Sequence, residues 1–324
     1  MRLRILGLWT LAIALWIVAP VVASPLKFSL PIDGQMGKAW FIQLYSDRDP
    51  SSGASDWGCG RLTYDQHKGT DFAIAHLGAK VKVLAAAPGK VLRTRDGVTD
   101  RPVRDLNDPQ IKGQECGNGV VIDHGKGWES QYCHLRQGSV EVKPGDLVSR
   151  GTVLGLVGQS GLASFPHVHF EVRHQNQVID PFMGDRPGNA CQSQPQSLWQ
   201  QPLAYVPTGL IDAGFSDRTP SLELAEQGEL NQAQFSSQAP SLVFWVRVFG
   251  VLAEDQESWR ILRPDLTVDS DRQQRISRSS KTWFSYLGKN NRQTLPPGTW
   301  TGEYSLRRGE RTIISLKRTV TIQN

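Results

Sequence analysis

The chain has 324 residues, with 36 Lys and Arg against 31 Asp and Glu, and a formal net charge of +5 at pH 7. This length favours two modules over one domain. Two of the positive charges belong to the amino-terminal segment, so the rest of the chain is only mildly basic, and a nucleic-acid partner is not indicated.

The amino-terminal segment has the pattern of a secretory signal peptide. Two arginines precede the apolar run 5–22, which ends at a small-residue cleavage site near Ala23. A transmembrane anchor is the alternative, because the run is almost long enough to span a bilayer, but Pro20 interrupts its end. We predict a signal peptide over residues 1–23, export to the periplasm or the medium, and no stable membrane insertion after its removal.

Four cysteines in an exported chain predict two disulfides. A thiolate zinc site is not favoured, because none of them forms the closely spaced pair of a zinc ribbon. Three pairings are possible. The segment from Cys116 to Cys133 has the pattern of a hairpin folded about residues 124–127, which would place these two cysteines opposite each other. Cys59 and Cys191 would then form the second disulfide.

Many short apolar runs, broken by Gly, Pro, Asn and Asp, predict a mostly β fold with little helix. The expected strands of the first module are 81–87, 90–94, 120–123, 129–135, a run over 147–156, and 167–172. Pairs of Pro and Gly, or of two Gly, mark the turns between them. This module ends near Asp180.

Residues 185–204 are rich in Pro, Gln and Ser and predict a linker. The strands expected beyond it, which indicate a smaller β-sandwich, are 241–252, 258–262, 282–287, 300–306 and 312–322. Four tryptophans of this module either stack on sugar rings or, as is commoner at alternating strand positions, pack in the core: Trp245, Trp259, Trp283 and Trp300. With no His or Cys after Cys191, the module is expected to bind or to act as a scaffold.

One stretch of the second module, residues 272–292, is basic. It contains Arg275, Arg278, Lys281 and Lys289 and no acidic residue. Such a stretch either contacts an anionic polymer of the cell envelope or, as is commoner, forms a solvated strand face and loop.

Two histidine motifs about a hundred residues apart suggest a divided metal site. His67 and Asp71 stand in the run HKGTD, and His167 and His169 stand in PHVHF. A catalytic zinc typically takes three His or carboxylate ligands and leaves a fourth position open. His167 and His169 share one face of the predicted strand. Glu171 follows on that face, either as an outer partner of the ligands or, as we predict, facing solvent.

A helix through HKGTD is doubtful because of Gly69, so we place His67 and Asp71 on a loop that enters a strand. A further candidate is His134 in the run QYCHL. Alternation places it on the face opposite Cys133. If that face also carries His167, two imidazoles would lie beside a metal ion without being ligands, as general base and as stabiliser of an oxyanion.

Together these motifs resemble the lysostaphin-type zinc endopeptidases, which cut the peptide part of bacterial peptidoglycan. The resemblance extends roughly from His67 to Phe182 and includes HKGTD, a His-Leu pair late in a hairpin, the run KPGDLVSRGTVLGLVGQSG, and HVH. It implies a Zn²⁺ cofactor with His67, Asp71 and His169 as ligands, and His134 and His167 as the catalytic pair.

The resemblance also implies an antiparallel, open-barrel-like peptidase domain over residues 24–184, which includes an amino-terminal extension, and leaves 205–324 as an accessory domain. The implied activity is hydrolysis of amide bonds in peptidoglycan crosslinks, with a regulatory partner in the envelope left open. Two alternatives remain. One is a non-catalytic wall-binding or amidase-activating module of the same fold. The other is a lipoyl-type carrier, which needs a lysine at a hairpin tip that is not evident here.

Overall fold

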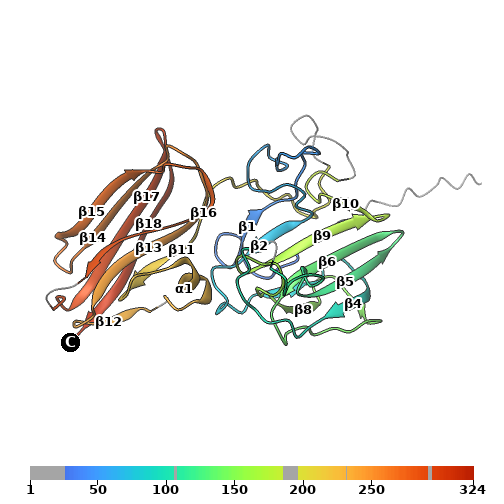
Figure 1. Cartoon of the computed structure of the whole chain (residues 1–324), viewed down its shortest axis with the longest axis horizontal. Helices are drawn as coiled ribbons and strands as arrows, with labels where there is room; N and C mark the ends of the chain where they lie inside the picture. The colour runs from blue at the N-terminus through green and yellow to red at the C-terminus, as the bar shows by residue number, and fades with distance from the viewer. Residues whose placement is uncertain (1–25, 106–107, 185–195, 231, 291–293) are drawn as a thin grey trace, which may run out of the picture.

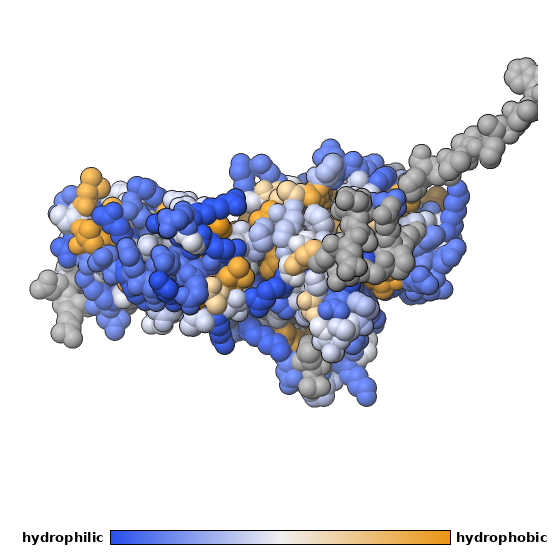
Figure 2. Space-filling model, turned by 90° about the horizontal axis from the view of Figure 1, so that it is seen from above, coloured by the Kyte–Doolittle hydropathy of each residue, from blue (hydrophilic) through white to orange (hydrophobic). Residues whose placement is uncertain are grey.

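The computed structural model describes residues 26–105, 108–184, 196–230, 232–290 and 294–324. This part of the chain is mostly β, as expected, and its one helix is the short α1 (Leu222–Gln227). None of its helices is long and apolar enough to cross a membrane. The predicted signal peptide and Cys191 lie outside the described residues. Figure 2 shows that one face of the molecule is mainly hydrophilic, with hydrophobic residues in small separate patches.

The first group of strands forms an open antiparallel sheet and a separate two-stranded pair (Figure 1). This confirms the expected antiparallel architecture. Its order is β1-β2-β9-β6-β5-β4-β7, with β10 paired to β9, and β3 and β8 form a separate pair. The strands are β1 (Phe41–Leu44), β2 (Thr70–Ala73), β3 (Lys82–Leu84), β4 (Gly89–Arg95), β5 (Asn118–Gly125), β6 (Trp128–Leu135), β7 (Leu147–Val148), β8 (Val153–Leu156), β9 (His167–His174) and β10 (Gln177–Ile179).

The centre of this sheet brings the histidine motifs together, because β9 lies between β2 and β6. In the register of these strands, His169 lies opposite Asp71 on one side and opposite Cys133 on the other. Phe170 and Val172 point into the core and are fully buried. The alternation expected along this strand is therefore present, and sheet pairing, not sequence proximity, assembles the site.

The run 147–156 contains two strands in different sheets, β7 and β8, in agreement with the turns between strands expected for the Gly-rich stretch 145–161. A turn separates β7 from β8, closed by a bond of 3.1 Å from the Thr152 N–H to the Ser149 carbonyl. Gly151 adopts a φ of +82° there, a left-handed conformation that suits glycine. Both short strands contribute a buried residue to the same core, Val148 from β7 and Leu154 from β8.

The predicted hairpin is confirmed as β5 and β6, which pair antiparallel. Its two cysteines, Cys116 and Cys133, form a disulfide with a Cα–Cα distance of 4.8 Å. Cys191, the expected partner of Cys59, lies outside the described residues.

The second group of strands is a sandwich of two sheets, as expected, with orders β11-β13-β16 and β12-β18-β17-β14-β15. Its strands are β11 (Gly209–Ser216), β12 (Gln234–Ser236), β13 (Ser241–Val251), β14 (Gln256–Leu262), β15 (Val268–Arg275), β16 (Ser280–Asn290), β17 (Gly298–Arg308) and β18 (Arg311–Gln323). Trp245, Trp259 and Trp300 are at most 1% exposed, and the half-buried Trp283 donates its indole N–H to Glu257. These tryptophans are core residues and do not form a sugar-stacking surface.

A buried ion pair between β13 and α1, both in the second module, also contacts the first group of strands. Arg247 of β13 is fully buried and lies 3.0 Å from a carboxylate oxygen of Glu226 in α1. Arg247 also donates to the carbonyl of Ala75, just after β2, at 3.0 Å, and Arg104 of the first group pairs with Glu226 at 2.9 Å. Removing one partner of such a buried pair leaves a charge uncompensated, at a cost of about 3–5 kcal/mol.

Candidate metal centre and active site

His67, Asp71 and His169 converge on one point. The Nε2 atom of His67 lies 3.2 Å from Oδ1 of Asp71 and 3.2 Å from Nδ1 of His169, and this Nδ1 lies 2.8 Å from the same carboxylate oxygen. His67 and Asp71 are 3% exposed, and the His169 side chain is 14% exposed. His67 precedes β2 on a loop, as expected, whereas Asp71, which was expected on the same loop, lies within that strand.

The orientation of the His67 ring fits a cation at this point. Its Nδ1 lies 2.6 Å from the carbonyl oxygen of Tyr45, so Nδ1 carries the proton and donates it. In the neutral ring, Nε2 then presents a lone pair toward Asp71 and His169. Two imidazoles and one carboxylate, with ligand atoms within 4.8 Å of one another, form a donor set that suits Zn²⁺.

The electrostatics of the cluster also favour a positive charge. Burial acts to raise the pKa of Asp71, but the charges of His67 and His167 and hydrogen bonds from His169 and His67 hold this pKa well below its usual range. Burial acts to lower the pKa of His169, but hydrogen bonds to Asp71 and Glu171 raise it to about 9. A buried site that stabilises a proton in this way also stabilises a metal cation.

His134 and His167 lie beside the cluster with their ring centroids 4.6 Å apart. Their Nδ1 atoms donate to the carbonyls of Ser160, at 2.7 Å, and Phe165, at 2.8 Å. Their Nε2 atoms are therefore left as acceptors in the neutral rings. Burial lowers the pKa of both, and the charges of neighbouring histidines push that of His134 well below its ordinary value. A lowered pKa favours the neutral form of each ring, which is the form that can act as a base.

Residues 65–181 match the model of Peptidase family M23. This segment is a peptidase M23 domain. The match agrees with the lysostaphin-type resemblance of the sequence and contains the whole histidine and aspartate cluster.

Similar proteins carry related names. The chain is 35% identical over 121 residues to "Peptidoglycan DD-endopeptidase ShyB" of Vibrio cholerae, and the alignment covers 37% of this chain and 24% of that protein. It is 38% identical over 84 residues to "DD-carboxypeptidase/endopeptidase Mpg" of Neisseria meningitidis, over 25% of this chain and 19% of that protein. The chain thus spans about a quarter or less of the length of these relatives.

Among solved structures, a "zinc containing peptidase from vibrio cholerae" aligns with a TM-score of 0.30 and 29% identity, over 47% of this chain and 41% of that one. A "putative peptidase M23 from pseudomonas aeruginosa" aligns with a TM-score of 0.31 and 29% identity, over 50% and 52% of the two chains.

Gly69 lets the two halves of the M23 cluster approach each other. A Cβ atom at this position would lie 2.6 Å from Nε2 of His169 and 2.6 Å from the carbonyl oxygen of Phe170. Both contacts are far inside van der Waals distance, and the second is with backbone, which cannot move aside cheaply. The glycine in HKGTD is therefore required for packing at the site, whereas the sequence alone suggested only that it breaks a helix.

The expectation that Glu171 faces solvent is wrong. Glu171 is 5% exposed, and one carboxylate oxygen lies 3.8 Å from Nε2 of His169. The other oxygen accepts from Arg173 at 2.6 Å, and Arg173 in turn donates to Gln131 of β6 at 2.7 Å. Gln131 of β6 lies opposite Glu171 in the strand register, so its side chain lies beside Glu171 on the same face of the sheet. Alternation assigns a residue to a face but does not show whether a neighbouring strand buries it.

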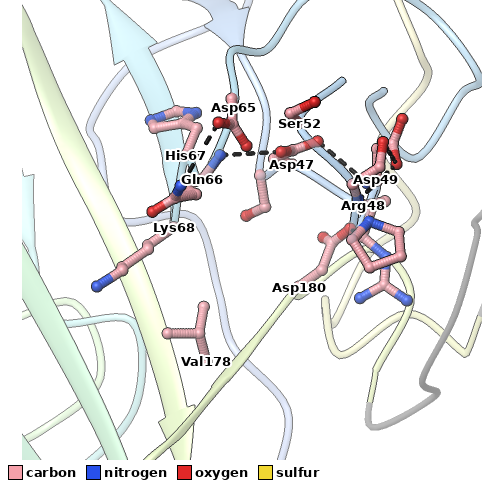
Figure 3. A pocket seen from close by; sticks show the side chains of 13 residues that line it. Asp47, Arg48, Asp49, Ser52, Asp65, Gln66, His67, Lys68, Val178 and Asp180 are labelled. Atoms are coloured by element: carbon pink, nitrogen blue, oxygen red, sulfur yellow. Dashed lines mark hydrogen bonds and ion pairs between the residues drawn. The ribbon is translucent and has the colours of Figure 1, made fainter. Parts of the chain in front are cut away.

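A cleft of about 590 Å³ opens beside His67. Figure 3 shows His67 and Lys68 on one side of it and Asp47, Asp49 and Asp180 on the other. Asp47 shapes this wall, because its carboxylate accepts from backbone N–H groups of three residues, Asp49, Ser55 and Gln66. The M23 domain thus has an open, polar approach to one of its candidate metal ligands.

Proposed function

We propose that the chain is a zinc-dependent endopeptidase that hydrolyses amide bonds in the peptide crosslinks of bacterial peptidoglycan. The observation that carries this proposal is the convergence of His67, Asp71 and His169 beside a second pair of histidines within an M23 domain. The names of the relatives support the choice of substrate. We therefore propose that the enzyme acts in the periplasm or outside the cell.

The reaction begins with attack of a water oxygen on the scissile carbonyl carbon. When bound by His67, Asp71 and His169, zinc polarises that carbonyl and lowers the pKa of water towards about 7. His134 or His167 accepts the water proton at its free Nε2. The ring that accepted this proton then transfers it to the leaving amine nitrogen as the C–N bond breaks, and the other ring stabilises the oxyanion when it is protonated at Nε2. The carbonyls of Ser160 and Phe165 hold both rings in the tautomer that this requires.

We further propose the domain organisation expected from the sequence. A signal peptide over 1–23 would be removed, a peptidase domain with an amino-terminal extension would span 24–184, and a linker over 185–204 would lead to an accessory domain over 205–324. Within the described part of the linker, Leu198 and Trp199 are buried in the core of the first group of strands, which ties this segment to the peptidase domain.

Digestion of purified peptidoglycan tests the proposal. The zinc-loaded chain without residues 1–23 is expected to separate crosslinked peptides, with the products identified by mass spectrometry, and a chelator-treated sample is expected to release none. A folded, zinc-loaded protein that leaves every crosslink intact would contradict the endopeptidase. A folded protein that binds no zinc would instead favour the non-catalytic binding module.

Glu171→Gln is expected to weaken zinc binding by about 10- to 100-fold, because outer partners that hold a ligating histidine typically contribute this much to metal affinity. The measurement is a competition titration of the full chain with a chromophoric chelator. Glu129→Gln is the matched control. Glu129 also pairs with Arg173, at 3.6 Å, but its side chain is 29% exposed and is not in contact with the cluster. Equal zinc affinities for the two variants would contradict the role of Glu171.

A further inference from the structure

A second pocket, of about 260 Å³, lies where the two groups of strands meet. The first group contributes Arg61 and Leu62, the sandwich contributes Val251 and Lys281, and the connecting segment contributes Tyr205. This pocket shares no lining residue with the cleft beside His67. It is therefore a separate site with its own chemistry, built from both parts of the chain.

The pocket carries positive charge that the protein itself does not neutralise. Of its three cationic side chains, Arg308 pairs with Asp255 at 2.8 Å. Arg61 and Lys281 form no ion pair with any other residue that the structure describes. Burial lowers the pKa of Lys281, and repulsion from Arg61 lowers it further, against a weaker opposing effect of Asp47. The two cations thus lie close enough to repel each other.

A buried carboxylate close in sequence to Arg61, that of Asp56, already accepts four hydrogen bonds. Asp56 accepts from the backbone N–H groups of Gly58, Gly60 and Leu62, and from the hydroxyl of Tyr205 at 2.9 Å. These bonds hold the loop that carries Arg61. Asp56 therefore shapes this wall of the pocket and is not free to pair with the two cations. A bound anion could pair with them instead.

The basic stretch 272–292 now divides into two kinds of residue. Arg275 pairs with Glu254 at 2.9 Å, and Lys289 pairs with Asp269 at 3.0 Å, as expected for a solvated face. Arg278 is exposed and lies outside the pocket. Among the cationic residues of the described part of this stretch, Lys281 is the one that lines the pocket, and Arg61 joins it there from the other part of the chain.

We propose that this pocket binds the carboxylate of a peptide, with Arg61 and Lys281 as the anion-binding pair. A guanidinium group offers parallel N–H donors that match the two oxygens of a carboxylate, and an ammonium group adds a point charge. The apolar atoms of Leu62, Val251 and Tyr205 fit a small side chain such as the methyl group of alanine. The choice of a peptide as the ligand rests on the proposed function, since the stem peptides of peptidoglycan end in alanine carboxylates. The assignment of an anion-binding site does not rest on that function.

Calorimetric titration of the full chain with N-acetyl-D-alanyl-D-alanine tests the inference, with chelator present so that no hydrolysis occurs. The carboxamide form of this peptide is expected to bind at least about tenfold more weakly, because it lacks the charge. Arg61→Gln and Lys281→Gln are expected to weaken binding of the carboxylate form by a similar factor. Arg278→Gln is the matched control and is expected to leave affinity within about twofold.

Equal binding of the carboxylate and carboxamide forms would overturn the inference, and this comparison needs no variant to fold. Unchanged affinity in Arg61→Gln and Lys281→Gln would overturn it too, as would inorganic phosphate binding more tightly than the peptide, which would point to a phosphate-bearing polymer. A chain that binds the peptide as expected but digests no peptidoglycan would refute the proposed function alone. One that digests peptidoglycan but does not bind the peptide would refute this inference alone.

Discussion

Replacing His169 with alanine is expected to abolish both zinc binding and cleavage of peptidoglycan. His169 is the only one of the three proposed ligands that contacts both Asp71, at 2.8 Å, and Glu171, at 3.8 Å, among the described residues. Its loss would leave two protein ligands, fewer than the three of a typical catalytic zinc site. Zinc content by atomic emission and product release by mass spectrometry measure the two effects.

His174→Ala is the matched control for this experiment. His174 lies on the same strand, β9, and stacks on Trp128 with ring centroids 4.1 Å apart, away from the cluster. This variant is expected to keep its zinc and its activity. If His169→Ala kept one zinc per chain and its cleavage rate, the proposed ligand set would be wrong. Circular dichroism of both variants separates loss of the site from loss of the fold.

His134→Ala is expected to retain zinc and to cleave crosslinks about 100-fold more slowly or worse. Loss of one acid, base or oxyanion partner typically has an effect of this size. His134 is buried, at 6% exposed, and lies close to His167. Its ring centroid is 6.0 Å from that of His169, and it is not one of the three converging ligands. The measurement pairs zinc content with the single-turnover rate.

The backbone at His134 calls for a second variant. His134 adopts a φ of +64°, and its N–H donates to the carbonyl of Cys116 at 2.8 Å. A change at this position could therefore disturb the neighbouring loop as well as remove the ring. His134→Asn suits a left-handed backbone better than alanine and equally lacks the imidazole. Full turnover with bound zinc in either variant would rule out the proposed role.

The candidate ligands could be predicted because their chemistry is visible in short motifs. His67 and Asp71 share one motif, and His167 and His169 share another. The structure brings both motifs to one point by pairing β2 with β9. Strand alternation was sufficient to place the histidines of β9 on the face opposite Phe170.

The partners that orient the site could not be predicted in the same way. The acceptors for His67, His134 and His167 are backbone carbonyls of Tyr45, Ser160 and Phe165. Every residue has a carbonyl, so the sequence gives no sign of which one lies near a given ring. The burial of Glu171 depends likewise on the neighbouring strand.

Some strands were missed for a related reason. Strand β15, with the sequence VDSDRQQR, is an edge strand of its sheet and has no buried residue. Hydrophobic alternation detects strands with one buried face, and β15 has no buried face. Strand β1 shows the opposite case, because all four of its residues are buried and no alternation results. Neither pattern differs clearly from a loop or a short apolar turn.

The buried pair between Arg247 and Glu226 limits which modules could replace the sandwich in a chimeric protein. Arg247 reaches the carbonyl of Ala75, only four residues after Asp71, so the sandwich holds the backbone next to the candidate metal centre. A chimera that replaced the sandwich with an unrelated module would leave this carbonyl and Arg104 without their partners. The accessory module therefore cannot be exchanged freely between proteins. Any replacement module would have to retain both α1 and Arg247.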